Sequence, residues 1–140
     1  MKFILKSEIE VLIKSNLLND LTQDNNLLLD ELEELAKSEI DALIGHKYNT
    51  TELFSKTGTD RNPFIKNIVI NIILYYLHNR LTPTSIPIIR EQLYKDAIGY
   101  LMQVASGKIT PPIPQNEIPF SRSSESLFGY SPKLNNDLTY

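Results

Sequence analysis

The chain has 140 residues, a formal net charge of −3 at pH 7, a pI near 5.4 and no cysteine. This length predicts one domain that can bury a core without covalent support. The lack of cysteine excludes a disulfide framework and a thiolate metal site, and the acidic balance argues against a protein whose main activity is to grip nucleic acid through its phosphates.

The first residues, MKFILKSEIE, place only Phe3, Ile4 and Leu5 between charged side chains. This apolar run is too short for the hydrophobic region of a secretion signal. The sequence therefore predicts a chain that stays in the cytoplasm of the cell that makes it.

A short first helix is predicted from Ser7, which forms a capping-box pattern with Glu10. Apolar residues follow at helical spacing, namely Ile9, Leu12, Ile13 and Leu17. A polar, turn-rich stretch over residues 19–26 separates this helix from the next element.

The second predicted helix is longer and amphipathic. Its apolar stripe consists of Leu28, Leu29, Leu32, Leu35, Ala36, Ile40, Leu43 and Ile44. Acidic residues gather on the opposite face, and Gly45 stands where a C-cap is expected. No sustained periodicity follows between Tyr48 and Arg61, and a connection of this length is typical of a long interaction loop.

The most apolar stretch covers residues 62–80, NPFIKNIVINIILYYLHNR. Its length favours a helix over a strand, Asn62 is suited to cap its N-terminus, and Pro63 falls in the first turn, where a proline loses no hydrogen bond. The apolar runs on either side of Asn71 are far shorter than the roughly 20 residues that a bilayer span needs. We therefore predict a central core helix around which the other helices pack.

A further helix is predicted to open at Pro87 and to end at Gly107. Gly99 inside it suggests close packing against another helix. The sequence thus predicts an all-α fold, a small bundle of about four helices around the central apolar helix, as one helical domain over residues 1–107.

Residues 108–140 differ in composition and are rich in proline and serine. Their apolar side chains are too sparse to offset the conformational entropy of ordering such a long segment, so it is predicted not to fold alone. We expect an extended C-terminal arm that anchors to a partner through Phe120, Leu127, Phe128 and Tyr130.

Signals of catalysis are weak. His46 and His78 stand at opposite ends of the predicted core without the spacing of a metal site, and both are interpreted as surface residues at helix ends. The sequence also contains no glycine-rich phosphate loop. The chain is predicted not to be an enzyme and to use no cofactor or metal.

The acidic face of the second helix contains Asp30, Glu31, Glu34 and Asp41. Such a cluster is most often a solvated helix face. The alternative is that these side chains face a DNA channel, where negative charge keeps phosphates from docking and lets the duplex slide past.

Three segments carry a resemblance to a known family. They are residues 40–48 (IDALIGHKY), the apolar helix that ends in Tyr75-Tyr76-Leu77, and residues 94–101 (YKDAIGYL) followed by Gly107-Lys108-Ile109. In these segments the chain resembles the small head-tail connector proteins of tailed bacteriophages, particularly the Mu-like neck group. The resemblance covers about residues 1–110.

The resemblance implies a helical adaptor that assembles as a dodecameric ring beneath the portal protein, prolongs the DNA channel and joins the capsid to a tail or tail-completion protein. It further implies that double-stranded DNA passes without specific binding, that no membrane is involved, and that the protein reaches the virion after assembly in the host cytoplasm. The alternative, from a different class, is a helical regulatory or binding module whose C-terminal tail is a docking peptide.

Overall fold

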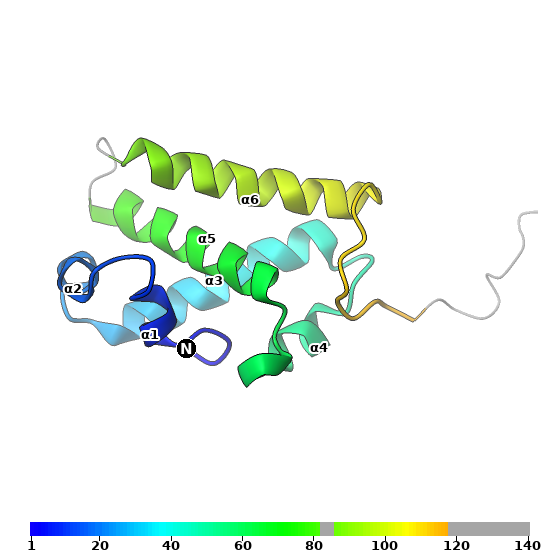
Figure 1. Ribbon diagram of the computed structural model, residues 1–140, viewed down its shortest axis with the longest axis horizontal. Helices are drawn as coiled ribbons and strands as arrows, with labels where there is room; N and C mark the ends of the chain where they lie inside the picture. Colours follow the sequence, from blue (N-terminus) through cyan, green and yellow to red (C-terminus); the bar gives the residue numbers. More distant parts are fainter. Residues whose placement is uncertain (82–85, 118–140) are drawn as a thin grey trace, which may run out of the picture.

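The computed structural model describes residues 1–81 and 86–117, which form a small all-α body (Figure 1). The all-α class predicted from the sequence is therefore confirmed. The elements in chain order are α1 (Lys6–Ile9), α2 (Ser15–Thr22), α3 (Asn26–Ile44), α4 (Thr50–Ser55), the 3₁₀ turn η1 (Gly58–Asp60), α5 (Pro63–Leu81) and α6 (Ile88–Ser106).

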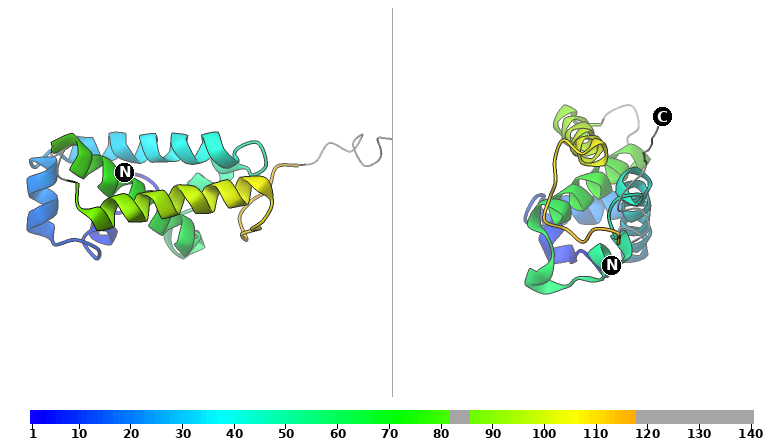
Figure 2. Two further views of the ribbon diagram at one scale, coloured as in Figure 1. Left: turned by 90° about the horizontal axis from the view of Figure 1, so that it is seen from above. Right: turned by 90° about the vertical axis from the view of Figure 1, so that its right-hand side faces the viewer.

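The body is built on its three long helices, because α3, α5 and α6 each contact the other two. α5 and α6 run in opposite directions along the length of the molecule (Figures 1 and 2). The short helices lie around this unit, with α2 packed on α3 and α5 and with α4 packed on α3. The result is the predicted small bundle with an elongated outline.

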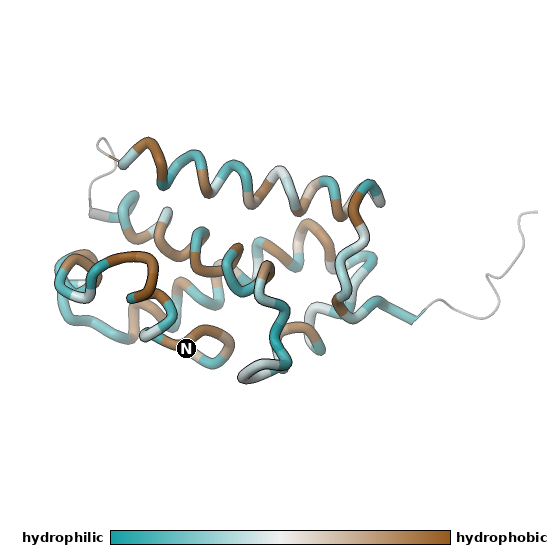
Figure 3. The backbone as a smooth tube through the Cα atoms, in the orientation of Figure 1, coloured by the Kyte–Doolittle hydropathy of each residue, from teal (hydrophilic) through white to brown (hydrophobic). Residues whose placement is uncertain are grey.

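α5 is the central helix that the sequence predicts. Asn62 caps it, since its side-chain oxygen accepts hydrogen bonds from the backbone N–H groups of Phe64 (2.9 Å) and Ile65 (3.0 Å). Apolar residues recur along the whole helix (Figure 3). Its buried side chains are Ile65, Ile68, Val69, Ile70, Asn71, Ile72, Ile73, Leu74, Leu77 and His78. These side chains point all around the helix axis, so neighbouring elements enclose α5 on most sides.

The prediction that His78 is a surface residue is wrong. Its side chain is 7% exposed, and its Nδ1 lies 2.8 Å from the carbonyl oxygen of Leu74, one turn earlier in α5. Its position near the end of the predicted helix suggested exposure, but the surrounding structure covers the imidazole one turn before α5 ends. His46 is exposed, as predicted.

The N-terminal region differs from the single helix expected from Ser7. α1 has four residues and starts after Leu5, whose backbone N–H donates to the Glu8 carboxylate (2.8 Å). α2 is a separate helix that extends to Thr22, into the stretch expected to be a turn. Of the four apolar residues that suggested one helix, two are buried and two are exposed, so their spacing did not describe one continuous face. The buried pair is Ile9 and Ile13, and the exposed pair is Leu12 and Leu17.

α3 matches the predicted second helix, and Gly45 follows its last residue. The backbone of Gly45 is right-handed (φ −64°), so a left-handed cap does not explain the glycine. A Cβ at this position would lie 2.4 Å from Oδ1 of Asp41. The close approach of Asp41 is therefore the reason for a residue without a side chain.

The connection from Tyr48 to Arg61 is not irregular, contrary to what the sequence suggested. It contains α4 and η1. Asn49 caps α4 by accepting a hydrogen bond from the backbone N–H of Glu52 (3.0 Å), and Leu53 is buried in the core. Helices this short give no readable periodicity, which is why the sequence did not show them.

α6 begins after Pro87 and ends at Gly107, as predicted, and Gly107 has the left-handed backbone (φ 88°) that favours glycine. The expectation of close helix packing at Gly99 is wrong, because a Cβ there would meet no atom within 4 Å. α6 contributes Ala97, Leu101 and Val104 to the core.

After α6 the chain turns back onto the body. The carbonyl oxygen of Pro114 accepts from the Asn49 N–H (2.9 Å), and Ile113 is buried. Asn116 donates from its backbone N–H to the Lys47 carbonyl (3.0 Å) and from its side-chain amide to the Gly45 carbonyl (2.9 Å). The first residues of the predicted arm therefore lie against the corner between α3 and α4.

Ile72 tests the central position of α5, because its side chain is 0% exposed. Ile72→Asp places an unpaired carboxylate in the core at a cost of several kcal/mol, comparable to the roughly 5–15 kcal/mol of a typical domain. We expect the variant to lose the helical circular dichroism signal and the cooperative thermal transition.

The matched control is Ile88→Asp on α6, where the side chain is 84% exposed. This variant should keep the spectrum and melting temperature of the parent. An Ile72→Asp protein that melts like the parent would refute the enclosed position of α5.

Candidate assembly surface

The first four residues form a hook over the N-terminal half of α3, and Glu33 holds it. Oε1 of Glu33 accepts from the Lys2 N–H (2.8 Å), and Oε2 accepts from the N–H groups of Phe3 (3.0 Å) and Ile4 (2.6 Å). Glu33 is 1% exposed, and these three donors offset the cost of burying its carboxylate. The sequence analysis missed this role, because nothing in the acidic pattern of α3 sets Glu33 apart from its neighbours.

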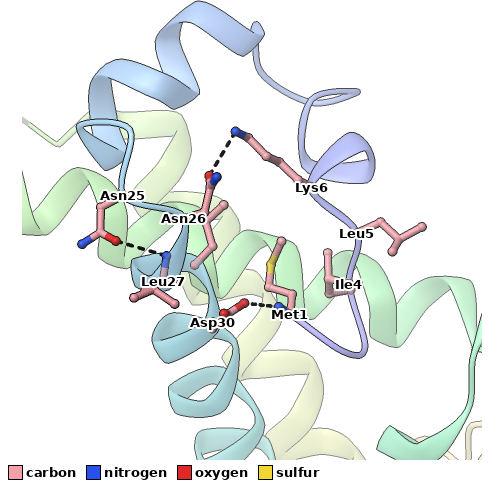
Figure 4. A pocket seen from close by; sticks show the side chains of 9 residues that line it. Met1, Ile4, Leu5, Lys6, Asn25, Asn26, Leu27 and Asp30 are labelled. Carbon is pink, nitrogen blue, oxygen red and sulfur yellow. Dashed lines mark hydrogen bonds and ion pairs between the residues drawn. The ribbon is translucent and has the colours of Figure 1, made fainter.

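A pocket of about 380 Å³ lies between this hook and the start of α3 (Figure 4). Lys6 Nζ donates to Oδ1 of Asn26 (3.1 Å), and the Met1 amino group forms an ion pair with Asp30. Leu5 and Leu27, which also line the pocket, are 56% and 70% exposed. These polar groups bind each other, while the apolar side chains are exposed. The pocket is therefore better suited to an apolar contact with another chain than to catalysis.

The structure gives different surroundings to the four acidic residues for which a DNA-channel role is the alternative to a solvated face. Asp30 is ion-paired to the Met1 amino group, and Asp41 accepts a hydrogen bond from the Thr50 hydroxyl of α4. These two carboxylates therefore take part in tertiary contacts.

Glu31 and Glu34 are the other two members, and both side chains are exposed. Oε2 of Glu34 lies 2.9 Å from Nζ of Lys37, one turn further along α3. A surface pair of this kind contributes little to stability. Glu31 and Glu34 are thus the two members of the cluster for which the structure shows no contact with another element, whereas Asp41 is exposed but bonded to α4.

A second carboxylate network joins the N-terminal region to α5. Nη1 and Nη2 of Arg61 donate to the two carboxylate oxygens of Glu8 at 2.8 and 2.7 Å, and Lys66 Nζ donates to Oε1 at 2.9 Å. Arg61 also donates to the carbonyl oxygens of Phe3 (2.6 Å) and Gly58 (2.8 Å). This geometry fixes α1, the hook and η1 to the start of α5.

The same network controls the charge of Glu8. The hydrogen bond from Arg61 is the main cause that lowers the pKa of Glu8 from 4.5 to about 2, with partial burial acting in the opposite direction and Lys66 adding to the lowering. The folded state therefore favours the carboxylate form.

A third carboxylate, Glu39 of α3, lies among tyrosines from α5 and α6. Its Oε2 accepts from the hydroxyls of Tyr94 (2.9 Å) and Tyr76 (3.1 Å), and the ring of Tyr75 stacks on Tyr94 with centroids 4.1 Å apart. Burial raises the pKa of both hydrogen-bonding tyrosines. Oε1 of Glu39 is buried and has no hydrogen-bond partner among the described residues. The cluster ties the three long helices together with polar contacts that the sequence analysis did not predict.

The predicted arm anchors Phe120, Leu127, Phe128 and Tyr130 lie outside the described residues. Within the described parts of the chain, no group of three or more His, Cys, Asp or Glu side chains is placed to hold a metal ion. None of the helices over residues 1–81 and 86–117 is long and apolar enough to cross a membrane.

A compact helical body with uncovered apolar pockets on its surface is typical of a protein that assembles with other chains. The model of the bacteriophage Mu Gp36 family matches residues 3–128. The chain belongs to this family and is therefore a phage structural or morphogenesis protein, from a family that is not a known enzyme family. No curated protein and no solved structure gives a significant match.

The family match confirms the resemblance to Mu-like phage proteins and extends beyond it. The resemblance covered about residues 1–110, whereas the matched region ends at residue 128. It therefore includes the segment packed on α3 and α4 and part of the predicted arm.

The Glu8 network predicts a pH dependence of stability. Because the pKa of Glu8 is lower in the folded state (about 2) than its ordinary value of 4.5, its stabilising contribution is complete above pH 4.5 and is lost as the pH falls from 4.5 towards 2. We expect urea unfolding at a series of pH values to show that Glu8→Gln destabilises the protein at pH 7. The free energy of unfolding of this variant should also fall less between pH 4.5 and 2 than that of the parent.

Glu31→Gln is the control, since Glu31 is an exposed acidic residue of α3. It should keep the parent's pH profile. Parallel profiles for the parent and Glu8→Gln between pH 4.5 and 2 would show that the network does not hold Glu8 in its charged form.

Proposed function

We propose that the protein is a head-tail connector subunit, which joins the capsid of a tailed bacteriophage to its tail. Family membership over residues 3–128 is the observation that carries this proposal. The uncovered apolar side chains support it, because a subunit that is buried between neighbours needs such surfaces. The most exposed of them are Val11, Leu27 and Ile88, at 81%, 70% and 84%.

In this proposal the subunits form a ring, expected to be dodecameric, beneath the portal protein. The ring contacts the portal on one side and a tail or tail-completion protein on the other, and it becomes part of the virion. The net charge of −3 is consistent with a channel that lets double-stranded DNA pass without binding it.

The decisive experiment is co-expression of the full chain with the portal and tail-completion proteins of the same phage, followed by negative-stain imaging. We expect rings seated on the portal. A chain that stays monomeric beside its phage partners and captures one host protein would instead identify a regulatory module with a docking tail.

The arm is proposed to complete this assembly. Cutting the chain after Glu117 removes Phe120, Leu127, Phe128 and Tyr130 but keeps the segment that packs on α3 and α4. In the same co-expression experiment, the truncated chain should keep its helical spectrum and lose the seated rings.

Phe128→Ala should weaken assembly by about 1–3 kcal/mol if this side chain is a buried anchor. Tyr140→Ala is the control, because Tyr140 lies outside the family-matched region. Complete connectors built from the truncated chain would show that the arm is dispensable.

Glu31 and Glu34, the exposed acidic residues of α3 that bind no other element, are proposed to face the DNA channel. Glu31→Lys combined with Glu34→Lys should leave the melting temperature nearly unchanged and should give assembled rings a salt-sensitive affinity for DNA, measured by fluorescence anisotropy. Asp20→Lys combined with Asp60→Lys changes the net charge equally at exposed positions outside α3 and is the control. Equal DNA affinity of the two charge-reversed rings would place Glu31 and Glu34 on an ordinary solvated face.

A further inference from the structure

An apolar groove crosses the exposed side of α5. It consists of two hollows of about 240 and 190 Å³, and Asn67 of α5 lines both of them. The first hollow lies between α5 and the connection from α1 to α2, where Val11 and Leu12 form its edge. The second lies between α5 and α6, where Phe64 and Tyr100 face each other. The two hollows are therefore neighbours on the same side of α5, with the exposed Asn67 between them, and we call them together the groove.

The edges of this groove are uncovered apolar side chains. Val11, Leu12 and Phe64 are 81%, 42% and 50% exposed, whereas Ile70 in its floor is 3% exposed. The charged groups at the edge already have partners, since Lys66 is bound to Glu8 and Asp96 accepts a hydrogen bond from Gln92 (2.7 Å). Such a surface gains most from an apolar segment that covers it.

The chain itself offers a segment with the required chemistry. Residues 118–128 follow the described body and contain Phe120, Leu127 and Phe128. The family match continues to residue 128, so this segment belongs to the family pattern and is not an appendage. The last twelve residues of the chain fall outside the match.

The reach of this segment is sufficient. Asn116 is fixed to Gly45 and Lys47 at the C-terminal end of α3, so the segment starts from a defined point. Eleven residues in extended form span up to about 36 Å, whereas the part of α5 under the groove, from Pro63 to Asn71, is about 12 Å long. The segment is therefore about three times as long as the part of α5 that it would cover, which leaves length for a connection between two bodies.

We propose that the groove over α5 receives residues 118–128 of a neighbouring copy, with Phe120 and the Leu127-Phe128 pair as its apolar anchors. This inference rests on the proposed connector function and names the surface that accepts the arm. A segment that leaves one copy and occupies a different surface of the next makes a head-to-tail contact, which closes into a ring when the rotation between copies allows it.

Disulfide trapping tests this contact, because the natural chain contains no cysteine. Two full-length proteins of different tag size are mixed under mild oxidation, one with Val11→Cys at the groove edge and one with Ser126→Cys beside the anchors. Each chain then carries a single thiol, so a disulfide between the two sizes is necessarily intermolecular. We expect this mixed dimer to form at least about tenfold faster than with Met102→Cys, a position on α6 that is 58% exposed and does not line the groove.

The anchors provide a second readout. Adding Phe128→Asp to the Ser126→Cys chain should reduce the trapped dimer to the Met102→Cys level, whereas adding Tyr140→Asp should not. Trapping that is insensitive to Phe128→Asp would overturn the proposal, because the groove would then not bind this anchor.

A single chain with both Val11→Cys and Ser126→Cys shows whether the groove binds the arm of its own chain or the arm of a neighbouring copy. If this chain closes an internal disulfide while the mixture gives no mixed dimer, the arm covers its own groove and the proposal is wrong. It is equally wrong if neither disulfide forms. In either of these cases, rings that still form on the portal would mean that only the groove proposal is wrong. If the protein formed no rings and did not bind the portal, the proposed connector function would be wrong as well.

Discussion

The enclosure of α5 is the constraint on which the rest of the structure depends. Ile68, Val69 and Ile70 are consecutive, so their side chains point about 100° apart around the helix axis. All three are buried, so no single neighbour can cover them. α3 and α6 cover two sides, and α2 covers part of a third. An apolar helix surrounded in this way fixes the order of the elements, because each neighbour must present an apolar face to a different part of α5.

Three glutamates add polar contacts to this core: two hold the N-terminal residues, and the third joins the long helices to each other. Glu33 binds the hook, Glu8 binds Arg61 and Lys66, and Glu39 binds tyrosines from α5 and α6. Each is a carboxylate that accepts several hydrogen bonds. Removing such a carboxylate leaves its donors without an acceptor, and this lowers the free energy of unfolding by more than the net strength of the hydrogen bonds. The hook and α1 are therefore held in place by Glu33 and Glu8, whereas α2 packs its buried Leu18 and Leu21 on α3 and α5.

The sequence predicted the long elements better than the short ones. Asn62, Pro87 and Gly107 mark helix ends whose physical cause is local, and α3, α5 and α6 are long enough for periodicity to be read. α1, α2 and α4 depend on tertiary contacts that have no local signal. The acidic residues of α3 show the same limit, because Glu33 and Glu31 look alike in sequence and differ only in what the fold brings to them: three backbone donors for one and solvent for the other.

The tight body and the sparse C-terminal segment have different physical demands, and this difference suits a protein that assembles in steps. The body reaches a packed core with its own residues, while Phe120 and Phe128 lie in a segment too poor in apolar residues to build a core. In the proposed assembly, the entropy cost of ordering such a segment is offset only when a partner surface is present, which would couple the ordering of the arm to assembly. The proposal places this contact in the groove beside α5, so the same helix that organises the core would also receive the arm of a neighbouring copy.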